Sequence, residues 1–389
     1  MTDAAVAAPA RIGINAAFLE PGMGGLETYV RELTPRLAAA APDSRITVVC
    51  NPRGRELLAA EPWADRVGLL VPRALKVPAT KAAFELTALG AIASRRFDVL
   101  LNVALTAPFA TRAANVVLLA DVTWIVVDDL RDGGGATVKL WRTVVPPVAR
   151  RADRVIALTG SGADDIVEHL GVARDRIDVI GLGYGSSAHA APTPGPALRA
   201  ALALGDGPVV LNVAAKKAHK NLMRLVEAMA AVRERVPGAQ LVMPGAPTPY
   251  QDELAARAAE LGIGDAVVLP GFVSAEDLEG LYALADCFAF PSINEGFGLP
   301  LLEAMARDVP VVTSTISAMP EVAGDAAVLV EPRSVEAIAT GIGDVLSDAA
   351  LRARLIAAGH GRLEAFTWEG SARATLATLA RADRERRGS

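Results

Sequence analysis

The sequence predicts an α/β protein with two open parallel sheets, and three observations lead to this prediction. A chain of 389 residues is too long for one ordinary hydrophobic core and fits two domains. Hydrophobic residues make up 52% of the chain and aromatic residues only 4%, so Ala, Val and Leu must fill the core, as in buried parallel strands flanked by helices. Short apolar runs alternate with helical patterns, which is typical of a doubly wound sheet.

Six apolar runs predict the strands of a first sheet within residues 1–190. Each run is bounded by turn residues, and helical patterns separate the runs. The runs are RIGINAAF from Arg11, RITVVC from Arg45, DVLLNVA from Asp98, NVVLLAD from Asn115, RVIALT from Arg154 and RIDVIGLG from Arg176. The stretch 186–200, SSAHAAPTPGPALRA, is rich in Ala and Pro and has no apolar period, so we expect an interdomain linker there.

A second series of runs predicts another sheet within residues 191–366. These runs are VVLNVA from Val209, QLVMPG from Gln240, AVVLPG from Ala266, CFAFPS from Cys287, VPVVTS from Val309 and AVLVEP from Ala327. Residues 367–389 form one more amphipathic pattern, and we expect this helix to pack back on the N-terminal domain. Open α/β sheets bind ligands at the carboxyl ends of their strands, so two such domains can face each other across a cleft.

Charge and cysteine content exclude several classes of protein. The net charge is -5, with 21 Lys/Arg against 20 Asp/Glu in residues 1–190 and 18 against 24 in the rest, so there is no basic footprint for nucleic acid. Cys50 and Cys287 lie in apolar runs without CxxC spacing, and the four histidines are scattered, so we expect no disulfide, no metal site and a cytoplasmic location. No uncharged stretch reaches the roughly 18 to 20 residues of a membrane span, although peripheral membrane contact is compatible with this composition.

The most informative local segment is PSINEGFGLPLLEAMARDVPVV, which starts at Pro291. We expect a strand to end at Ser292, a loop to contain Gly296 and Gly298, and a helix to begin near Leu299. Backbone N–H groups at such a strand-to-helix turn point toward the positive end of the helix dipole, which favours phosphate.

Two glutamates bracket this glycine-rich turn. Glu295 lies in the loop and Glu303 about one turn into the helix, so both can point into one crevice and accept hydrogen bonds from sugar and ribose hydroxyls. Alternatively, the turn is an ordinary one and Glu303 is solvated. The combination of both glutamates with the glycines favours a binding site.

Three further segments offer candidate ligand contacts. Lys216 and Lys220 follow a predicted strand end and could offset a diphosphate charge, or could belong to a solvated loop. Gly24 and Gly25 precede a predicted helix, where a loop can approach phosphate closely or simply form a turn. Asp121 ends another predicted strand and either orients a ligand hydroxyl or caps a turn.

These motifs resemble glycosyltransferase family 4, a large retaining family of the GT-B fold, in which a Glu, seven residues and a second Glu surround a Gly-Phe-Gly-Leu-Pro core. The resemblance covers nearly the whole chain. It includes GMGGLETYVREL, LNVAAKKAHKNL, PGFVSAEDLEGLYALADCFAFPS and AFTWEGSA, and the core matches at Glu295, Gly296, Phe297, Gly298, Leu299, Pro300 and Glu303. It implies two Rossmann-like domains facing across a cleft, with the donor held mainly by the C-terminal one.

The resemblance also implies roles for individual residues. Glu295 would contact the transferred sugar and Glu303 the nucleotide ribose, while Gly296, Phe297, Gly298 and Leu299 would cradle the sugar and diphosphate. Lys220 matches the family lysine, whereas Ala215 occupies the usual arginine position with Lys216 alongside. Gly24 and Gly25 would lie near the donor phosphate and acceptor. Ala120 precedes Asp121 where the family has a histidine before the aspartate.

The predicted activity is therefore transfer of a hexose or related sugar from a nucleoside-diphosphate sugar to a hydroxyl acceptor, with retention implied by the resemblance. We expect the nucleotide sugar as a substrate, with neither cofactor nor metal. A catalytically silent nucleotide-sugar-binding protein is the alternative, supported by the missing histidine. A GT-A enzyme, a dehydrogenase and a P-loop NTPase fit poorly, because the chain lacks Asp-x-Asp, a GxGxxG after the first strand, and any Gly-Lys pair.

Overall fold

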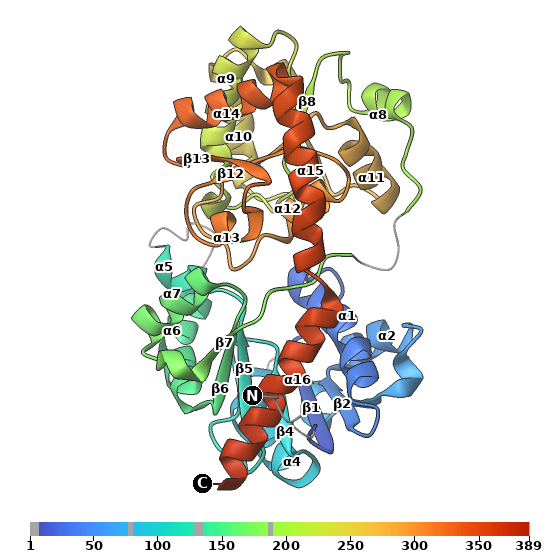
Figure 1. Cartoon of the computed structure of the whole chain (residues 1–389), viewed down its shortest axis with the longest axis vertical. Coiled ribbons are helices and arrows are strands. Elements are labelled where there is room, and N and C mark those ends of the chain that lie inside the picture. Colours follow the sequence, from blue (N-terminus) through green and yellow to red (C-terminus); the bar gives the residue numbers. More distant parts are fainter. Residues whose placement is uncertain (1–7, 77–80, 128–134, 186–189, 389) are drawn as a thin grey trace. The chain divides into compact units, whose positions relative to one another are not determined.

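The computed structural model describes residues 8–76, 81–127, 135–185 and 190–388. The chain divides into two compact units, each considered by itself below (Figure 1). Unit 1 comprises Met1–Ile125, Gly135–Gly183 and Phe366–Ser389. Unit 2 comprises Val126–Gly134 and Tyr184–Ala365.

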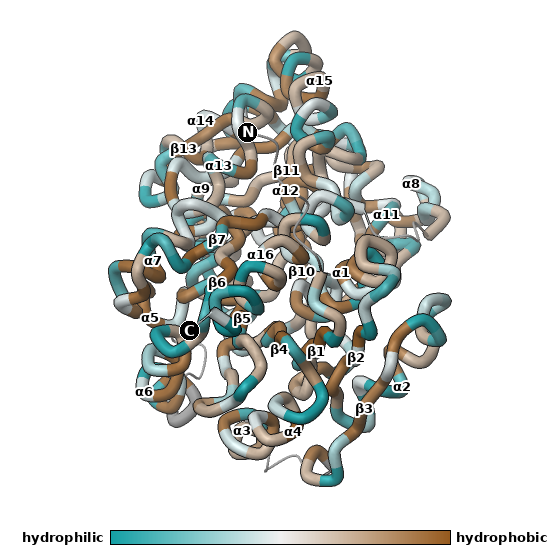
Figure 2. The backbone as a smooth tube through the Cα atoms, turned by 60° about the horizontal axis from the view of Figure 1, so that its bottom comes forward, coloured by the Kyte–Doolittle hydropathy of each residue, from teal (hydrophilic) through white to brown (hydrophobic). Residues whose placement is uncertain are grey.

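Unit 1 contains a seven-stranded parallel sheet with the order β3-β2-β1-β4-β5-β6-β7. Val48 of β2 and Leu101 of β4 flank Ile14 of β1, and all three side chains are buried. Figure 2 shows β5 as a mostly hydrophobic stretch, as expected for a strand covered on both faces. The strands are β1 Arg11–Ala16, β2 Arg45–Cys50, β3 Gly68–Leu70, β4 Val99–Asn102, β5 Ala114–Leu119, β6 Arg154–Ala157 and β7 Ile177–Val179.

The helices of unit 1 begin where the sequence supplies caps. The Asn51 side chain accepts a hydrogen bond from the Gly54 N–H, and Thr159 does the same for Gly162, so α2 and α7 start at satisfied N-caps. The helices are α1 Gly25–Ala40, α2 Pro52–Ala59, α3 Lys81–Ala83, α4 Leu89–Arg96, α5 Thr123–Val126, α6 Gly135–Arg151, α7 Gly160–Leu170 and α16 Trp368–Gly388, with a π-helical turn at Phe84–Ala88 before α4.

Helix α16 packs against α1 within unit 1, although the two helices lie far apart in the sequence. The buried Trp368 ring meets Tyr29 edge-on at 6.1 Å between centroids, and Arg36 forms an ion pair with Glu369 at 2.7 Å. Gly183 passes so close to the Trp368 backbone that a Cβ atom would lie 2.1 Å from its nitrogen. Only glycine allows this approach.

Unit 2 contains a six-stranded parallel sheet with the order β10-β9-β8-β11-β12-β13. Renumbered from β8, this is the 3-2-1-4-5-6 order of a Rossmann sheet. The strands are β8 Val209–Leu211, β9 Gln240–Pro244, β10 Val267–Gly271, β11 Cys287–Phe290, β12 Val311–Ser314 and β13 Ala327–Val330. The helices are α8 Gly195–Ala201, α9 Leu222–Arg235, α10 Tyr250–Glu260, α11 Ala275–Leu284, α12 Leu299–Met305, α13 Met319–Ala323, α14 Val335–Ser347 and α15 Ala349–Ala365.

The expected linker is only partly irregular. Residues 186–189 lie outside the described residues, but the stretch then contains α8, Gly195–Ala201, where the sequence predicts no helix. This prediction was wrong because α8 has only seven residues, and the short helix contributes just one buried apolar side chain, Leu198, so no period is visible. Strand β11 also ends at Phe290, two residues before the expected end at Ser292.

No helix in the part of the chain that the structure describes is long and apolar enough to cross a membrane. Likewise, its histidine, cysteine and acidic side chains form no group of three or more that could hold a metal ion.

Candidate functional site

Lys220 and Glu295 form an ion pair at the carboxyl edge of the unit 2 sheet. The Lys220 Nζ donates to both carboxylate oxygens of Glu295, at 2.6 and 2.8 Å, and both side chains are largely buried. The pair forms because β8 and β11 are neighbours and both strands lead into its loops. The Lys220 ammonium also lies 5.4 Å from the centre of the Phe290 ring. A positive group and a carboxylate therefore meet where open α/β sheets bind ligands.

Asn221 follows Lys220 and links the loop after β8 by hydrogen bonds to the loops after β11 and β13. It adopts the left-handed conformation with φ 61°, which asparagine tolerates better than most residues. Its buried side-chain amide donates to the carbonyl of Pro291 at 2.9 Å and to that of Pro332 at 2.6 Å. The Ile293 N–H adds a bond to the His219 carbonyl at 2.8 Å. These bonds hold Lys220 in register with the segment that carries Glu295.

Ser317 holds the backbone of Glu295. Its hydroxyl accepts from the Glu295 N–H at 3.0 Å and donates to the Glu295 carbonyl at 2.9 Å, so one side chain satisfies both main-chain groups. Ser317 itself has φ 59°, an uncommon conformation for a non-glycine residue. Neither Ser317 nor Asn221 is predicted from the sequence, since Ser317 belongs to no recognised motif and Asn221 is an uncharged residue beside Lys220.

The glycine-rich turn after Glu295 leads directly into α12. Gly298 has φ 108°, a backbone conformation that favours glycine, and a Cβ atom there would lie 2.6 Å from the methyl group at the flexible end of the Met319 side chain. Phe297 is buried, whereas Gly296 and Leu299 are partly exposed. The turn thus presents its backbone beside the Lys220–Glu295 pair, with one aromatic side chain anchored in the core.

Glu303, the second glutamate of the motif, has different partners from Glu295. Its Oε2 accepts from the Tyr282 hydroxyl at 3.1 Å. Burial raises the pKa of the Glu303 carboxyl, and the hydrogen bond from Tyr282 and the charge of Arg307 oppose this rise. The Arg307 guanidinium carbon lies 4.6 Å from the centre of the Tyr282 ring, and the same guanidinium donates a hydrogen bond to Glu279. Arg307 therefore packs against the ring whose hydroxyl bonds to Glu303. The two glutamates therefore lie in separate electrostatic environments.

Lys216 is fully buried and does not join Lys220. Its Nζ donates to the carbonyls of Met243 at 2.5 Å and Gly245 at 3.4 Å, at the end of β9. Burial lowers the pKa of its ammonium to about 8. Gly245, with φ 131°, would bring a Cβ atom 2.2 Å from the Ala214 carbonyl, so the backbone is tightly packed around this lysine.

The unit 1 candidates occupy two exposed turns. Gly24, with φ 65°, is the N-cap of α1 and is exposed, as is Gly25. The Glu27 carboxylate accepts a hydrogen bond from the backbone N–H of Gly22 at 2.7 Å, which stabilises the loop that precedes α1. Asp121 is exposed after β5, and its Oδ1 accepts from the Thr123 N–H at 3.0 Å, the geometry of a turn residue.

Family models match both halves of the chain. The model described as Glycosyltransferase Family 4 matches residues 23–184, and the model described as Glycosyl transferases group 1 matches residues 196–362. Solved structures share the fold. HepE from Anabaena, in complex with UDP and glucose, superposes with a TM-score of 0.74 at 21% identity and covers 96% of this chain and 100% of its own. Sucrose-phosphate synthase from Thermosynechococcus elongatus superposes with a TM-score of 0.70 at 21% identity and covers 94% of this chain and 97% of its own. With the two Rossmann-type sheets, this likeness confirms the GT-B fold class.

Curated relatives extend the match at higher identity. The MMP alpha-(1->4)-mannosyltransferase of Mycolicibacterium hassiacum is 32% identical over 60% of this chain and 56% of its own. The GDP-mannose-dependent alpha-(1-6)-phosphatidylinositol monomannoside mannosyltransferase of Mycolicibacterium smegmatis is 34% identical over 62% and 67%. O-antigen chain mannosyltransferase B of Escherichia coli is 44% identical over 27% of this chain and 28% of its own. The matched segments therefore span about a quarter to two thirds of the length of these relatives. The family models match both halves of the chain, and the 34% identity to the Mycolicibacterium smegmatis enzyme extends over 67% of that relative. The chain therefore belongs to glycosyltransferase family 4.

Proposed function

We propose that this chain transfers a hexose or related sugar from a nucleoside-diphosphate sugar to a hydroxyl acceptor, with retention at the anomeric carbon. The observation that carries the proposal is the Lys220–Glu295 pair at the carboxyl edge of the unit 2 sheet. The printed names of similar proteins support the donor class, since one relative is called GDP-mannose-dependent and one neighbour was solved with UDP and glucose.

In this proposal the diphosphate competes with Glu295 for Lys220. The bond between the anomeric carbon and the diphosphate oxygen breaks, and the acceptor oxygen bonds to that carbon on the same face. The acceptor proton passes to the departing diphosphate oxygen. Lys220 stabilises the charge that develops on this oxygen, so neither metal nor cofactor is needed for that task. Glu295 then holds a hydroxyl of the transferred sugar.

The other candidates position the donor and acceptor. Glu303 accepts hydrogen bonds from the nucleotide ribose, and the turn from Gly296 to Leu299, with Phe297 and Gly298 between them, lies against the sugar and diphosphate. Lys216 supports the donor loop through its bonds to the end of β9. In unit 1, Gly24 and Gly25 approach the donor phosphate and acceptor, and Asp121 orients the acceptor hydroxyl.

A nucleotide-sugar screen tests this function. We expect GDP-mannose or another hexose nucleotide to raise the unfolding temperature, because a ligand that binds only the native state stabilises it. Release or transfer of the sugar from the same donor is then measured by chromatography. Binding without any turnover of the bound donor would support the catalytically silent alternative. No stabilisation and no turnover with GDP, UDP and dTDP sugars would contradict the proposal.

Ser317→Ala tests whether the Glu295 backbone must be held. The substitution removes the hydroxyl that bonds to both main-chain groups of Glu295, so we expect kcat to fall about tenfold, in keeping with the loss of about 1.4 kcal/mol of positioning hydrogen bonds. The Kd for free nucleoside diphosphate should change little. Equal kcat in wild type and Ser317→Ala would show that these two hydrogen bonds are not needed to position Glu295.

A further inference from the structure

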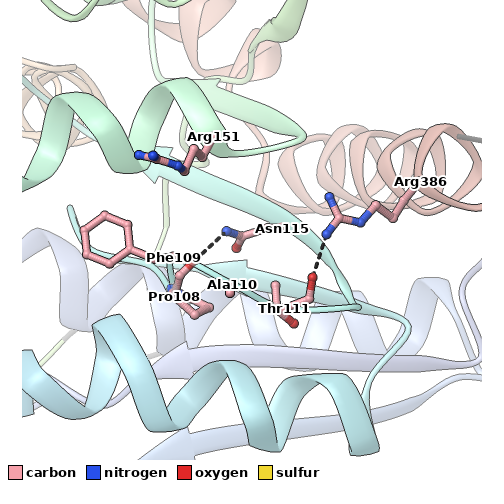
Figure 3. A pocket seen from close by; sticks show the side chains of 7 residues that line it. All are labelled: Pro108, Phe109, Ala110, Thr111, Asn115, Arg151 and Arg386. Atoms are coloured by element: carbon pink, nitrogen blue, oxygen red, sulfur yellow. Dashed lines mark hydrogen bonds between the residues drawn. The ribbon is translucent and has the colours of Figure 1, made fainter.

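A pocket of about 370 Å³ lies in unit 1 at the amino edge of its sheet, the edge opposite to the one that binds ligands in open α/β folds. The loop after β4 reaches this edge before β5 begins at Ala114, and the C-terminal ends of α6 and α16 lie beside it. Figure 3 shows Arg151 and Arg386 coming from these two helices on the same side of the loop. The lining residues are Pro108, Phe109, Ala110, Thr111, Asn115, Arg151 and Arg386.

A second pocket of about 220 Å³ shares Arg386 with the first. Together their linings contain five arginines against two aspartates, which is a local excess of three positive charges in a chain of net charge -5. The five arginines are Arg11, Arg112, Arg151, Arg386 and Arg387, and the two aspartates are Asp98 and Asp383. Arginine rather than lysine supplies every positive charge of this lining.

Three of these arginines already have carboxylate partners. Arg11 pairs with Asp98 at 2.8 Å, Arg387 with Asp383 at 2.8 Å, and Arg386 with Asp153 at 3.2 Å, and Arg386 also donates to the Thr111 carbonyl at 2.6 Å. Asp153 lies outside both linings and offsets the charge of Arg386, so the excess falls to two positive charges, those of the remaining two arginines.

Arg112 and Arg151 are exposed, and no carboxylate of the described residues lies within 4.0 Å of either guanidinium. Arg151 is the last residue of α6, where a positive charge also complements the helix dipole. That role alone does not explain why its guanidinium lies over an aromatic ring. The Phe109 ring centre is 5.9 Å from the Arg151 guanidinium carbon, and Phe109 is 42% exposed.

We propose that this pocket binds a phosphate group, with Arg151 as its main ligand and Phe109 as an apolar wall beside it. The guanidinium fork matches the geometry of phosphate oxygens, and the neighbouring positive charges attract anions to the hollow. Phe109 suits the carbon skeleton that carries the phosphate. The phosphate belongs to an anionic lipid headgroup or to a soluble phosphate ester, and the site is independent of the proposed transferase activity.

Binding of two probes to the whole chain tests the proposal. The lipid probe is a vesicle of phosphatidylcholine and phosphatidylglycerol in equal parts, measured by co-sedimentation against pure phosphatidylcholine. The soluble probe is glycerol 3-phosphate, measured by calorimetry. Arg151→Ala should weaken binding of the relevant probe about fivefold, the effect of one arginine near an anionic surface, and added salt should weaken it further.

Two control variants separate this site from general electrostatics. Arg73→Ala removes an exposed arginine that follows β3, at the carboxyl edge of the same sheet, and should leave binding unchanged. Arg151→Lys keeps the charge but not the fork, so its binding should lie between wild type and Arg151→Ala. Each variant's unfolding temperature verifies that the chain still folds.

The outcomes identify the source of the phosphate. Arg151-dependent binding to anionic vesicles that glycerol 3-phosphate does not displace assigns the site to lipid. Arg151-dependent binding of glycerol 3-phosphate that persists in Lys220→Ala assigns it to a soluble ester. The proposal is overturned if neither probe binds, if Arg73→Ala weakens binding as much as Arg151→Ala, or if Lys220→Ala alone abolishes glycerol 3-phosphate binding.

Discussion

Lys220→Ala is expected to slow sugar transfer about a hundredfold, because it removes one preorganised positive charge, worth about 2.7 kcal/mol, from the departing diphosphate. The same substitution should weaken binding of the free nucleoside diphosphate, since both states carry the phosphate charge. The effect has a second source in the structure. Without Lys220, the largely buried Glu295 carboxylate loses both of its short hydrogen bonds to an ammonium group. Steady-state rates and calorimetry measure the two effects.

Lys217→Ala is the matched control for this prediction. Lys217 lies three residues earlier in the same loop, is exposed, and contributes its carbonyl rather than its side chain to the turn that ends at Lys220. Its substitution should leave both kcat and Kd near wild type. If Lys217→Ala and Lys220→Ala behave alike, the loop acts through its overall charge, and the assignment of Lys220 to the diphosphate is wrong.

Glu295→Gln and Glu303→Gln should separate catalysis from nucleotide binding. Glu295→Gln keeps the size of the side chain but removes the charge that pairs with Lys220, so we expect kcat to fall by about a hundredfold. Binding of free diphosphate should not weaken, because the neutral amide competes less strongly for Lys220. Glu303→Gln should weaken the intact donor and the free diphosphate alike, because both contain the ribose. Glu234→Gln, an exposed position on α9, controls for loss of a negative charge. Equal weakening of free diphosphate by both site variants would refute this division of roles.

The pH dependence of binding gives an additional readout for Glu303. Burial raises the pKa of its carboxyl above the ordinary glutamate value. Below that raised pKa the group is protonated and accepts hydrogen bonds less well, and above it the ionised group can accept from ribose hydroxyls. Nucleoside diphosphate should therefore bind wild type more tightly as the pH rises through this pKa, whereas Glu303→Gln should show no such rise.

Sequence periodicity predicts most of the fold, because buried parallel strands are continuous apolar runs. The runs that begin at Arg11 and Arg154 become β1 and β6 with the same first residues. Strand β3, Gly68–Leu70, is absent from the prediction, since three partly buried residues after a 3-10 turn give no recognisable run. Helix α8 is also absent from the prediction, because its seven residues are too few to show a helical period.

The candidate site is only partly visible in the sequence. The motif identifies Glu295 and Glu303, and spacing after a strand identifies Lys220, but their roles stay predictions. The contacts that position them depend on the order of strands in the sheet. Ser317 reaches Glu295 because β11 and β12 are neighbours, so the loops that follow these strands lie side by side. A linear pattern contains no signal for that contact.

Unit 1 combines segments from both ends of the chain, so ribosomal synthesis completes it only after unit 2. Its helix α16 contains the buried residues Trp368 and Leu379 and follows all of unit 2 in the chain. At ~5–20 residues per second, roughly 10 to 40 seconds pass between translation of Gly183 and of Phe366. Throughout that time the surface of α1 around Tyr29 lacks the helix that covers it in the finished molecule. The nascent N-terminal half thus presents a transient apolar surface on which a chaperone can act, and it gains its final packing only after unit 2 has been made.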